Sequence, residues 1–101
     1  MTIRYIDKDP AAILTYSVNW TEWISSPDAL ITSNIAISTI TGDPTPITIV
    51  SQGFITGANL AYAELSGGSA GNTYTVTNTI TTDDGNRDAR RFRLRVMQRF
   101  L

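Results

Sequence analysis

The stretch from Ser66 to Val96 constrains the fold most, because a turn signal separates two segments in which apolar and polar residues alternate. The apolar positions of the two segments are Tyr74, Val76 and Ile80, then Phe92, Leu94 and Val96. Threonines take the opposite parity in the first segment, and arginines take it in the second. Alternation with period two is typical of strands with one buried and one solvated face. Since Asp83-Asp84-Gly85-Asn86 supplies residues that tolerate positive φ, the stretch predicts a β-hairpin.

Short β-rich segments precede this hairpin and are separated by turns rich in Gly, Pro and Asp. The predicted strands cover residues 13–20, 29–40, 47–50, 54–56 and 60–65, and residues 1–10 form either an extended arm or an edge strand. Within 29–40, the residues Ile31, Ser33, Ile35 and Ile37 share one parity, which predicts a single strand with a bulge at Ser33-Asn34. No segment has about ten residues of helical periodicity.

This pattern predicts an all-β fold in which the residues 1–101 form one domain. About seven short antiparallel strands at such spacing are typical of an immunoglobulin-like β-sandwich, and a small barrel is the main alternative. With 101 residues the chain is long enough for one hydrophobic core but not for two.

The charge of the chain is distributed unevenly. Residues 1–86 carry two basic and eight acidic residues, whereas residues 87–101 carry six arginines and Asp88. Three of these arginines, Arg91, Arg93 and Arg95, alternate along one strand face. They either pair with carboxylates on a neighbouring strand, dock an acidic partner such as another copy of the chain, or track nucleic acid. A net charge of −1 and the lack of interleaved aromatic residues disfavour nucleic acid and favour protein contact.

Trp20 ends the predicted strand over residues 13–20, and Trp23 lies in a predicted loop over residues 21–28. One of them is expected to cap the core, and Trp23 is alternatively an exposed anchor for a partner. A different function, carbohydrate binding, would require Trp20, Trp23 and Tyr62 to form one exposed aromatic platform.

The composition removes several kinds of chemistry. The chain has no cysteine and no histidine, which excludes disulfides, thiolate metal sites and Ser-His-Asp catalysis. The carboxylates fall mostly in turns, and Asp83-Asp84-Gly85-Asn86 fits a turn better than a calcium loop because the distal Glu is absent. We therefore expect no cofactor, no metal and no enzymatic activity. The chain also lacks a membrane-length apolar run and a signal-peptide pattern, so a protein made in the cytoplasm is expected.

Two long motifs give the chain a resemblance to a known family. The first is KDPAAILTYSVNWTEWI near the N-terminus, and the second is LSGGSAGNTYTVTNTITTDDGNRDARRFRLRV near the C-terminus. In both motifs the chain resembles the bacteriophage fibre–tail adaptors, which are small virion proteins of the tail or neck. The resemblance implies a structural subunit that joins the tail tube to fibres, in several copies around the tail axis. It implies other tail, neck and fibre proteins as partners, a place in the virion after assembly in the host cytoplasm, and no catalytic residues.

Overall fold

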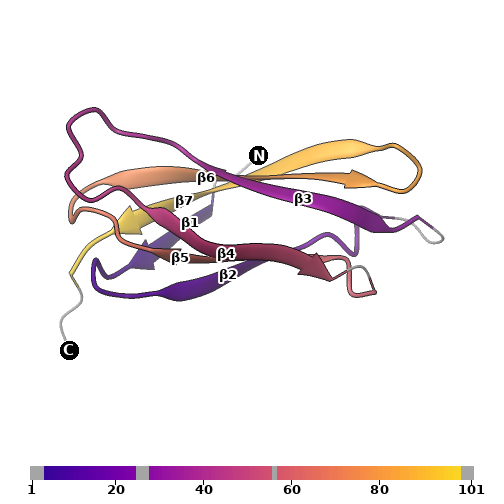
Figure 1. Ribbon diagram of the computed structural model, residues 1–101, viewed down its shortest axis with the longest axis horizontal. Helices are drawn as coiled ribbons and strands as arrows, with labels where there is room; N and C mark the ends of the chain where they lie inside the picture. The colour runs from indigo at the N-terminus through magenta and orange to yellow at the C-terminus, as the bar shows by residue number, and fades with distance from the viewer. Residues whose placement is uncertain (1–3, 25–27, 56, 99–101) are drawn as a thin grey trace.

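A computed structural model describes residues 4–24, 28–55 and 57–98, in which seven strands and no helix are present (Figure 1). The strands are β1 (Arg4–Lys8), β2 (Leu14–Asn19), β3 (Leu30–Ile37), β4 (Thr48–Ile55), β5 (Leu60–Ser66), β6 (Thr73–Thr82) and β7 (Arg87–Val96). The all-β prediction is confirmed. Parts of three predicted segments, residues 1–3, 25–27 and 56, lie outside the described residues.

The strands form two sheets that lie one over the other (Figure 1). The four-stranded sheet has the order β1-β7-β6-β3, and the three-stranded sheet has the order β2-β5-β4. Because the described strands divide between two separate sheets, the barrel alternative is wrong. The expectation that all strands pair antiparallel is also wrong for one pair, since β1 runs parallel to β7. The chain passes from β1 into β2 of the other sheet, so β1 forms no hairpin and pairs with the last strand.

The predicted hairpin is confirmed as β6 and β7. These strands pair antiparallel, with Tyr74 opposite Leu94 and Val76 opposite Phe92. All six apolar side chains predicted to face inward are buried. The turn between the strands contains Gly85 at a φ of 87°. Asn78 and Thr82 also occupy inward positions of β6 and are buried despite their polarity.

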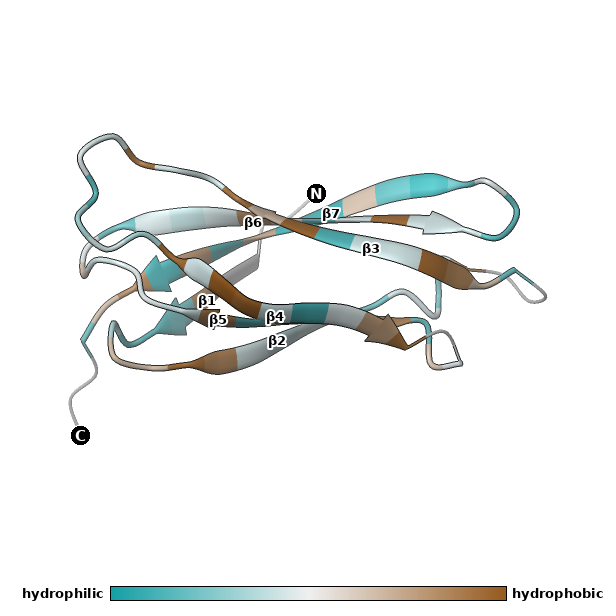
Figure 2. Ribbon diagram, in the orientation of Figure 1, coloured by the Kyte–Doolittle hydropathy of each residue, from teal (hydrophilic) through white to brown (hydrophobic). Residues whose placement is uncertain are grey.

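The β3 and β4 strands depart from the predicted pattern. Figure 2 shows hydrophobic residues at the start of β3 and at the end of β4. The register of β3 against β6 shifts between Leu30 and Thr32, not at Ser33-Asn34. This bulge turns Leu30 inward and leaves Ile31 45% exposed, contrary to the predicted parity. Residues 48–55 form one strand instead of two, because β4 pairs with β5 from Thr48 to Ile55. The Tyr62 ring of β5 lies over the glycine at position 53.

A buried lysine and two glycines close one end of the molecule. Lys8 is fully buried, and its Nζ donates hydrogen bonds to the carbonyl oxygens of Gly67 at 2.7 Å and Asp9 at 3.0 Å. Burial lowers the pKa of the Lys8 amine, and the nearby Asp9 opposes that change. Gly67 and Gly68 have φ values of 81° and 97°, which favour glycine. A Cβ on Gly68 would lie 2.7 Å from Cγ2 of Val96, so this loop packs directly on the end of β7.

Asp43 organises the polar groups at the same end. Its carboxylate accepts hydrogen bonds from the Ser69 hydroxyl at 2.5 Å, from the Tyr74 hydroxyl and from the Thr45 N–H at 3.2 Å. The bonds from Ser69 and Tyr74, and then that from Thr45, hold the pKa of Asp43 below its ordinary value of 3.8 although partial desolvation opposes them. The side chain therefore joins the loop before β4 to the loop before β6.

We predict that Gly68→Ala destabilises the fold more than Gly71→Ala. Both glycines have positive φ, which costs a residue with a Cβ about 1 kcal/mol. Nothing lies within 4 Å of a Cβ added at Gly71, whereas one at Gly68 collides with Val96. The collision should add about 1–3 kcal/mol to the loss of unfolding free energy, measured by urea denaturation. Equal losses for the two variants would contradict the close packing.

We also predict that Asp43 contributes to stability in a pH-dependent way. Because its pKa is lower in the folded chain, its contribution is complete above pH 3.8 and disappears as the pH falls through the depressed value. Urea denaturation between pH 7 and about 2.5 should show a steeper acid-side loss in the wild type than in Asp43→Asn. Parallel stability curves for the two proteins would contradict this role.

Candidate partner-binding site

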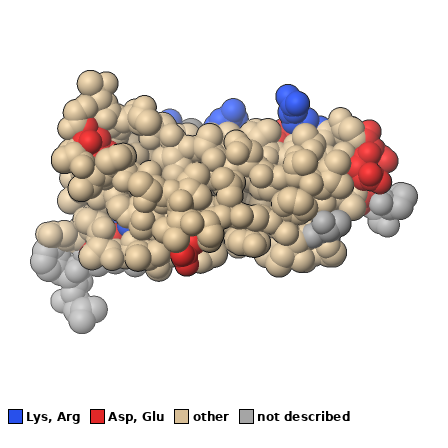
Figure 3. Space-filling view, in the orientation of Figure 1, with Lys and Arg blue, Asp and Glu red and all other residues tan. Residues whose placement is uncertain are grey.

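The arginine stripe, defined as Arg91, Arg93 and Arg95, lies on the outer face of the four-stranded sheet. The apolar residues between these arginines face the core, so the alternation of β7 sends the stripe to the opposite side. On the neighbouring strand β6, the cross-strand partners of these arginines are three threonines, in the same order: Thr77, Thr75 and Thr73. Figure 3 shows blue atoms along the rim where β7 runs and a red cluster at the end that carries the β6–β7 turn.

The three arginines of the stripe have different surroundings. Arg95 donates from Nε to Oδ1 of Asp7 at 2.9 Å, across the β1–β7 pair. Arg93 is half-buried, and its buried Nε has no hydrogen-bond partner among the described residues. Arg91 is exposed and forms no ion pair with any described residue. The prediction of pairing with a neighbouring strand is thus correct for Arg95, while Arg91 presents its charge to solvent.

The two tryptophans take different roles. Trp20 is fully buried and caps the core, while Trp23 is half-buried and packs edge-on against it, with ring centroids 5.6 Å apart. Tyr62 belongs to the outer face of the three-stranded sheet, where it covers Gly53. The exposed aromatic platform required for carbohydrate binding is therefore not formed, because Trp20 is inaccessible.

Asn78 is the acceptor for the buried indole of Trp20, and the sequence pattern did not single it out. The Trp20 Nε1 donates to Oδ1 of Asn78 at 2.8 Å. The Asn78 amide in turn donates to the Ser33 hydroxyl at 2.8 Å and to the Asn34 carbonyl at 3.2 Å. Trp20 follows β2 and Asn78 belongs to β6, so the bond joins the two sheets. The signal available in the sequence was an amide side chain at an inward position between the apolar residues Val76 and Ile80.

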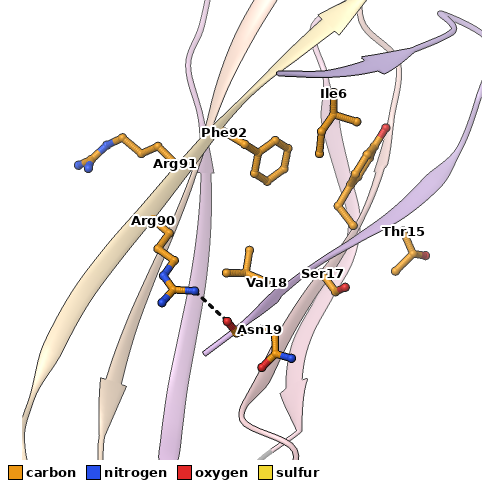
Figure 4. Close-up of a pocket in the computed structure, with 9 residues that line it drawn as sticks. Ile6, Thr15, Ser17, Val18, Asn19, Arg90, Arg91 and Phe92 are labelled. Carbon is orange, nitrogen blue, oxygen red and sulfur yellow. Dashed lines mark hydrogen bonds between the residues drawn. The ribbon is translucent and has the colours of Figure 1, made fainter. Parts of the chain in front are cut away.

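Arg90 is a second residue that the sequence interpretation missed. It shares the parity of Phe92, so its side chain points toward the other sheet (Figure 4). Its guanidinium stacks 4.3 Å above the centroid of a Trp20 ring, and its Nη1 donates to the Asn19 carbonyl at 2.8 Å. Arg90 therefore bridges β7 to the end of β2, with a cation–π contact that helps to hold the indole.

The acidic residues of the described chain do not form a metal site. Within residues 4–24, 28–55 and 57–98, no three carboxylate side chains gather in a way that could hold a metal ion. At the β6–β7 turn, Asp28 accepts hydrogen bonds from the backbone N–H groups of Asp84 and Ala29, both at 2.9 Å. The described part of the chain likewise contains no helix with the length and apolar character needed to cross a membrane.

Comparison with known families accounts for most of the chain. A family model described as podophage GP4 fiber-tail adaptor protein gp77 matches residues 8–95. The chain belongs to this family. The match includes the central strands, the whole first motif and all of the second motif except Val96. A search of curated proteins found no match.

The structure explains why the two motifs of the adaptor resemblance occur together. Lys8 of the first motif donates to Gly67 of the second, and Trp20 of the first donates to Asn78 of the second. Both contacts are made by buried side chains of residues far apart in the sequence. These motif residues therefore maintain the fold, and the surface that contacts partners must be sought outside these buried contacts.

We predict that Asn78→Ala costs about 1–3 kcal/mol of unfolding free energy, since it leaves the Trp20 Nε1 buried without an acceptor. In a Trp20→Phe background the same change should cost less, because that donor is absent. A double-mutant cycle by urea denaturation measures the difference. The control Thr79→Ala, on the outer face of β6, should change stability by less than about 0.5 kcal/mol. Additive effects of the two core substitutions would contradict the proposed coupling.

Proposed function

We propose that the chain is a structural subunit of a phage tail that links the tail tube or nozzle to the tail fibres through protein–protein contacts. Membership of the fibre–tail adaptor family supports this role. The proposal includes several copies around the tail axis, other tail, neck and fibre proteins as partners, and assembly in the host cytoplasm. A chain without histidine or cysteine suits a structural rather than an enzymatic role.

We further propose that residues 1–101 form one domain of immunoglobulin-like topology. The orders β2-β5-β4 and β7-β6-β3 correspond to the B-E-D and G-F-C orders of immunoglobulin sheets. Both hydrophobic clusters contain residues from the two sheets, which supports a single core unit. The difference from the constant-type arrangement is that β1 joins β7 and leaves the edge of β2 without a first strand.

The arginine stripe is the surface that we assign to partner contact. The observation that carries this assignment is Arg91, which is exposed, forms no ion pair with any described residue and lies at one end of a row of cations on a sheet face. Arginine forms planar, bidentate hydrogen bonds with carboxylates, so an acidic surface of a neighbouring subunit is the complementary partner. The half-buried Trp23 adds an accessible aromatic edge, which we propose as a secondary anchor.

Replacement of Arg91, Arg93 and Arg95 by serine tests this assignment. The isolated domain should remain folded, because the stripe lies on the outer face and the exposed Arg95–Asp7 pair contributes only about 0–1 kcal/mol. Incorporation into particles, measured by mass spectrometry of purified virions after complementation, should fall by about tenfold or more.

The matched controls are the same three positions replaced by lysine and the single change Arg87→Ser. Lysine keeps the charge but not the bidentate geometry, so incorporation should fall less than with serine. Arg87 lies on β7 outside the stripe, and its replacement should have little effect. Normal incorporation of a folded triple serine variant would refute the assignment.

A further inference from the structure

The outer edge of β2 is the least protected strand edge among the described residues. The four edge strands of the two sheets are β1, β3, β2 and β4. Proteins protect such edges with charges, prolines, bulges or very short strands, because unpaired backbone groups recruit other chains. The β1 strand is short and charged, β4 has a register shift between Ile49 and Ser51, and β3 has one between Leu30 and Thr32. The Gln52 side chain also accepts from the Ile35 N–H of β3 at 2.9 Å.

The β2 strand has none of these devices. Its sequence LTYSVN contains no charge and no proline, and its pairing with β5 is continuous from Leu14 to Asn19. The Trp20 N–H donates to Asn59 on the β5 side, whereas the Asn19 carbonyl accepts from Arg90 on the opposite side. Since backbone groups alternate in direction along a strand, Thr15 and Ser17 point their N–H and C=O groups the same way as Asn19. No described residue pairs with these outward groups of Thr15 and Ser17.

A groove of about 450 Å³ lies beside this edge (Figure 4). Its described lining consists of Ile6, Thr15, Tyr16, Ser17, Val18, Asn19, Arg90, Arg91 and Phe92. Ile6, Val18 and Phe92 point into the space between β2 and β7, and Arg91 points away from it (Figure 4). The groove thus combines an apolar floor with a free backbone edge.

Arg90 gives this groove its charge preference. The guanidinium bonds Asn19 through a single nitrogen and is exposed, so further donors remain for a ligand. The described lining of the groove includes no carboxylate. A carboxylate placed beside Arg90 would therefore form a charge-assisted hydrogen bond without a competing anion in the groove.

We propose that β2 accepts an extended, acidic segment of another protein as an additional strand. The segment pairs its backbone with Thr15, Ser17 and Asn19, seats alternate apolar side chains over Phe92 and Val18, and places a carboxylate at Arg90. This mode of recognition uses main-chain hydrogen bonds for affinity and alternate side chains for specificity. The proposal concerns a different surface from the arginine stripe. It rests on the adaptor function only for the expectation that a neighbouring virion protein supplies the segment.

The test uses the full chain and synthetic peptides of about eight residues with acetylated N-termini and amidated C-termini. Each peptide alternates valine and threonine and carries one glutamate, and the position of the glutamate differs from one peptide to the next. Nuclear magnetic resonance spectra should show amide exchange slowed by about tenfold at Thr15, Ser17 and Asn19 at a peptide concentration of about 1 mM. Peptides with lysine in place of glutamate should protect these amides at least about tenfold less. Peptides N-methylated at alternate residues should not protect them, because their pairing edge is blocked.

The variant Ser17→Pro removes one outward N–H and leaves the groups that face β5 in place, so binding should be lost. The N-methylated peptides test the same point without a substitution if this variant does not fold. Three results would each overturn the proposal: no protection of these amides by any glutamate peptide, changes confined to Arg91–Arg95, or concentration-dependent protection without peptide. The last result would assign the edge to a second copy of the chain. Presence of the wild-type chain in purified virions, measured by mass spectrometry, tests the adaptor function independently of these measurements.

Discussion

The hydrogen bond between the Trp20 indole and Asn78 holds the two sheets in one relative position. Both side chains are buried, and a buried donor or acceptor without a partner is expensive. The Asn78 amide also bonds Ser33 and Asn34, so one polar side chain coordinates β3, β6 and the residue that follows β2. Apolar contacts tolerate small displacements of one sheet over the other, whereas a satisfied polar network accepts only one arrangement. Arg90 adds a cation–π contact to this arrangement, because its guanidinium stacks on the Trp20 indole.

At the other end of the molecule, close packing of a glycine loop adds to the packing of side chains. The glycine pair Gly67-Gly68 lets a loop approach Pro46 and Val96 more closely than any residue with a Cβ would allow. The Lys8 Nζ donates a hydrogen bond to the Gly67 carbonyl oxygen, which connects the end of β1 to the same loop. The buried contacts between the two family motifs lie at these two ends, where they join the sheets. The same motifs also include Trp23 and the arginine stripe, so they combine residues that maintain the fold with residues that we propose for partner contact.

The division of roles along β7 follows from strand geometry. Alternate residues point to opposite faces, so one strand supplies the core with Phe92 and its apolar companions and supplies the outer face with the arginine stripe. Arg90 points to the same face of β7 as the core residue Phe92, but its side chain is exposed. It reaches across to the other sheet and donates to the Asn19 carbonyl. A single strand thus presents cations to two different surfaces. We propose the outer surface for contact with a folded acidic partner and the groove for an extended segment.

The sequence by itself determined the hairpin, its buried face and the location of the positive charge, because alternation and turn chemistry are local properties of consecutive residues. Only the tertiary structure decided which strands became neighbours. The parallel pairing of β1, the bulge that turns Leu30 inward in place of Ile31, and the roles of Asn78 and Arg90 all depend on contacts between distant segments. No local pattern specifies such contacts, since the same strand sequence is compatible with several partners and registers. The open edge of β2 is likewise a consequence of topology: it exists because β1 pairs with the other sheet.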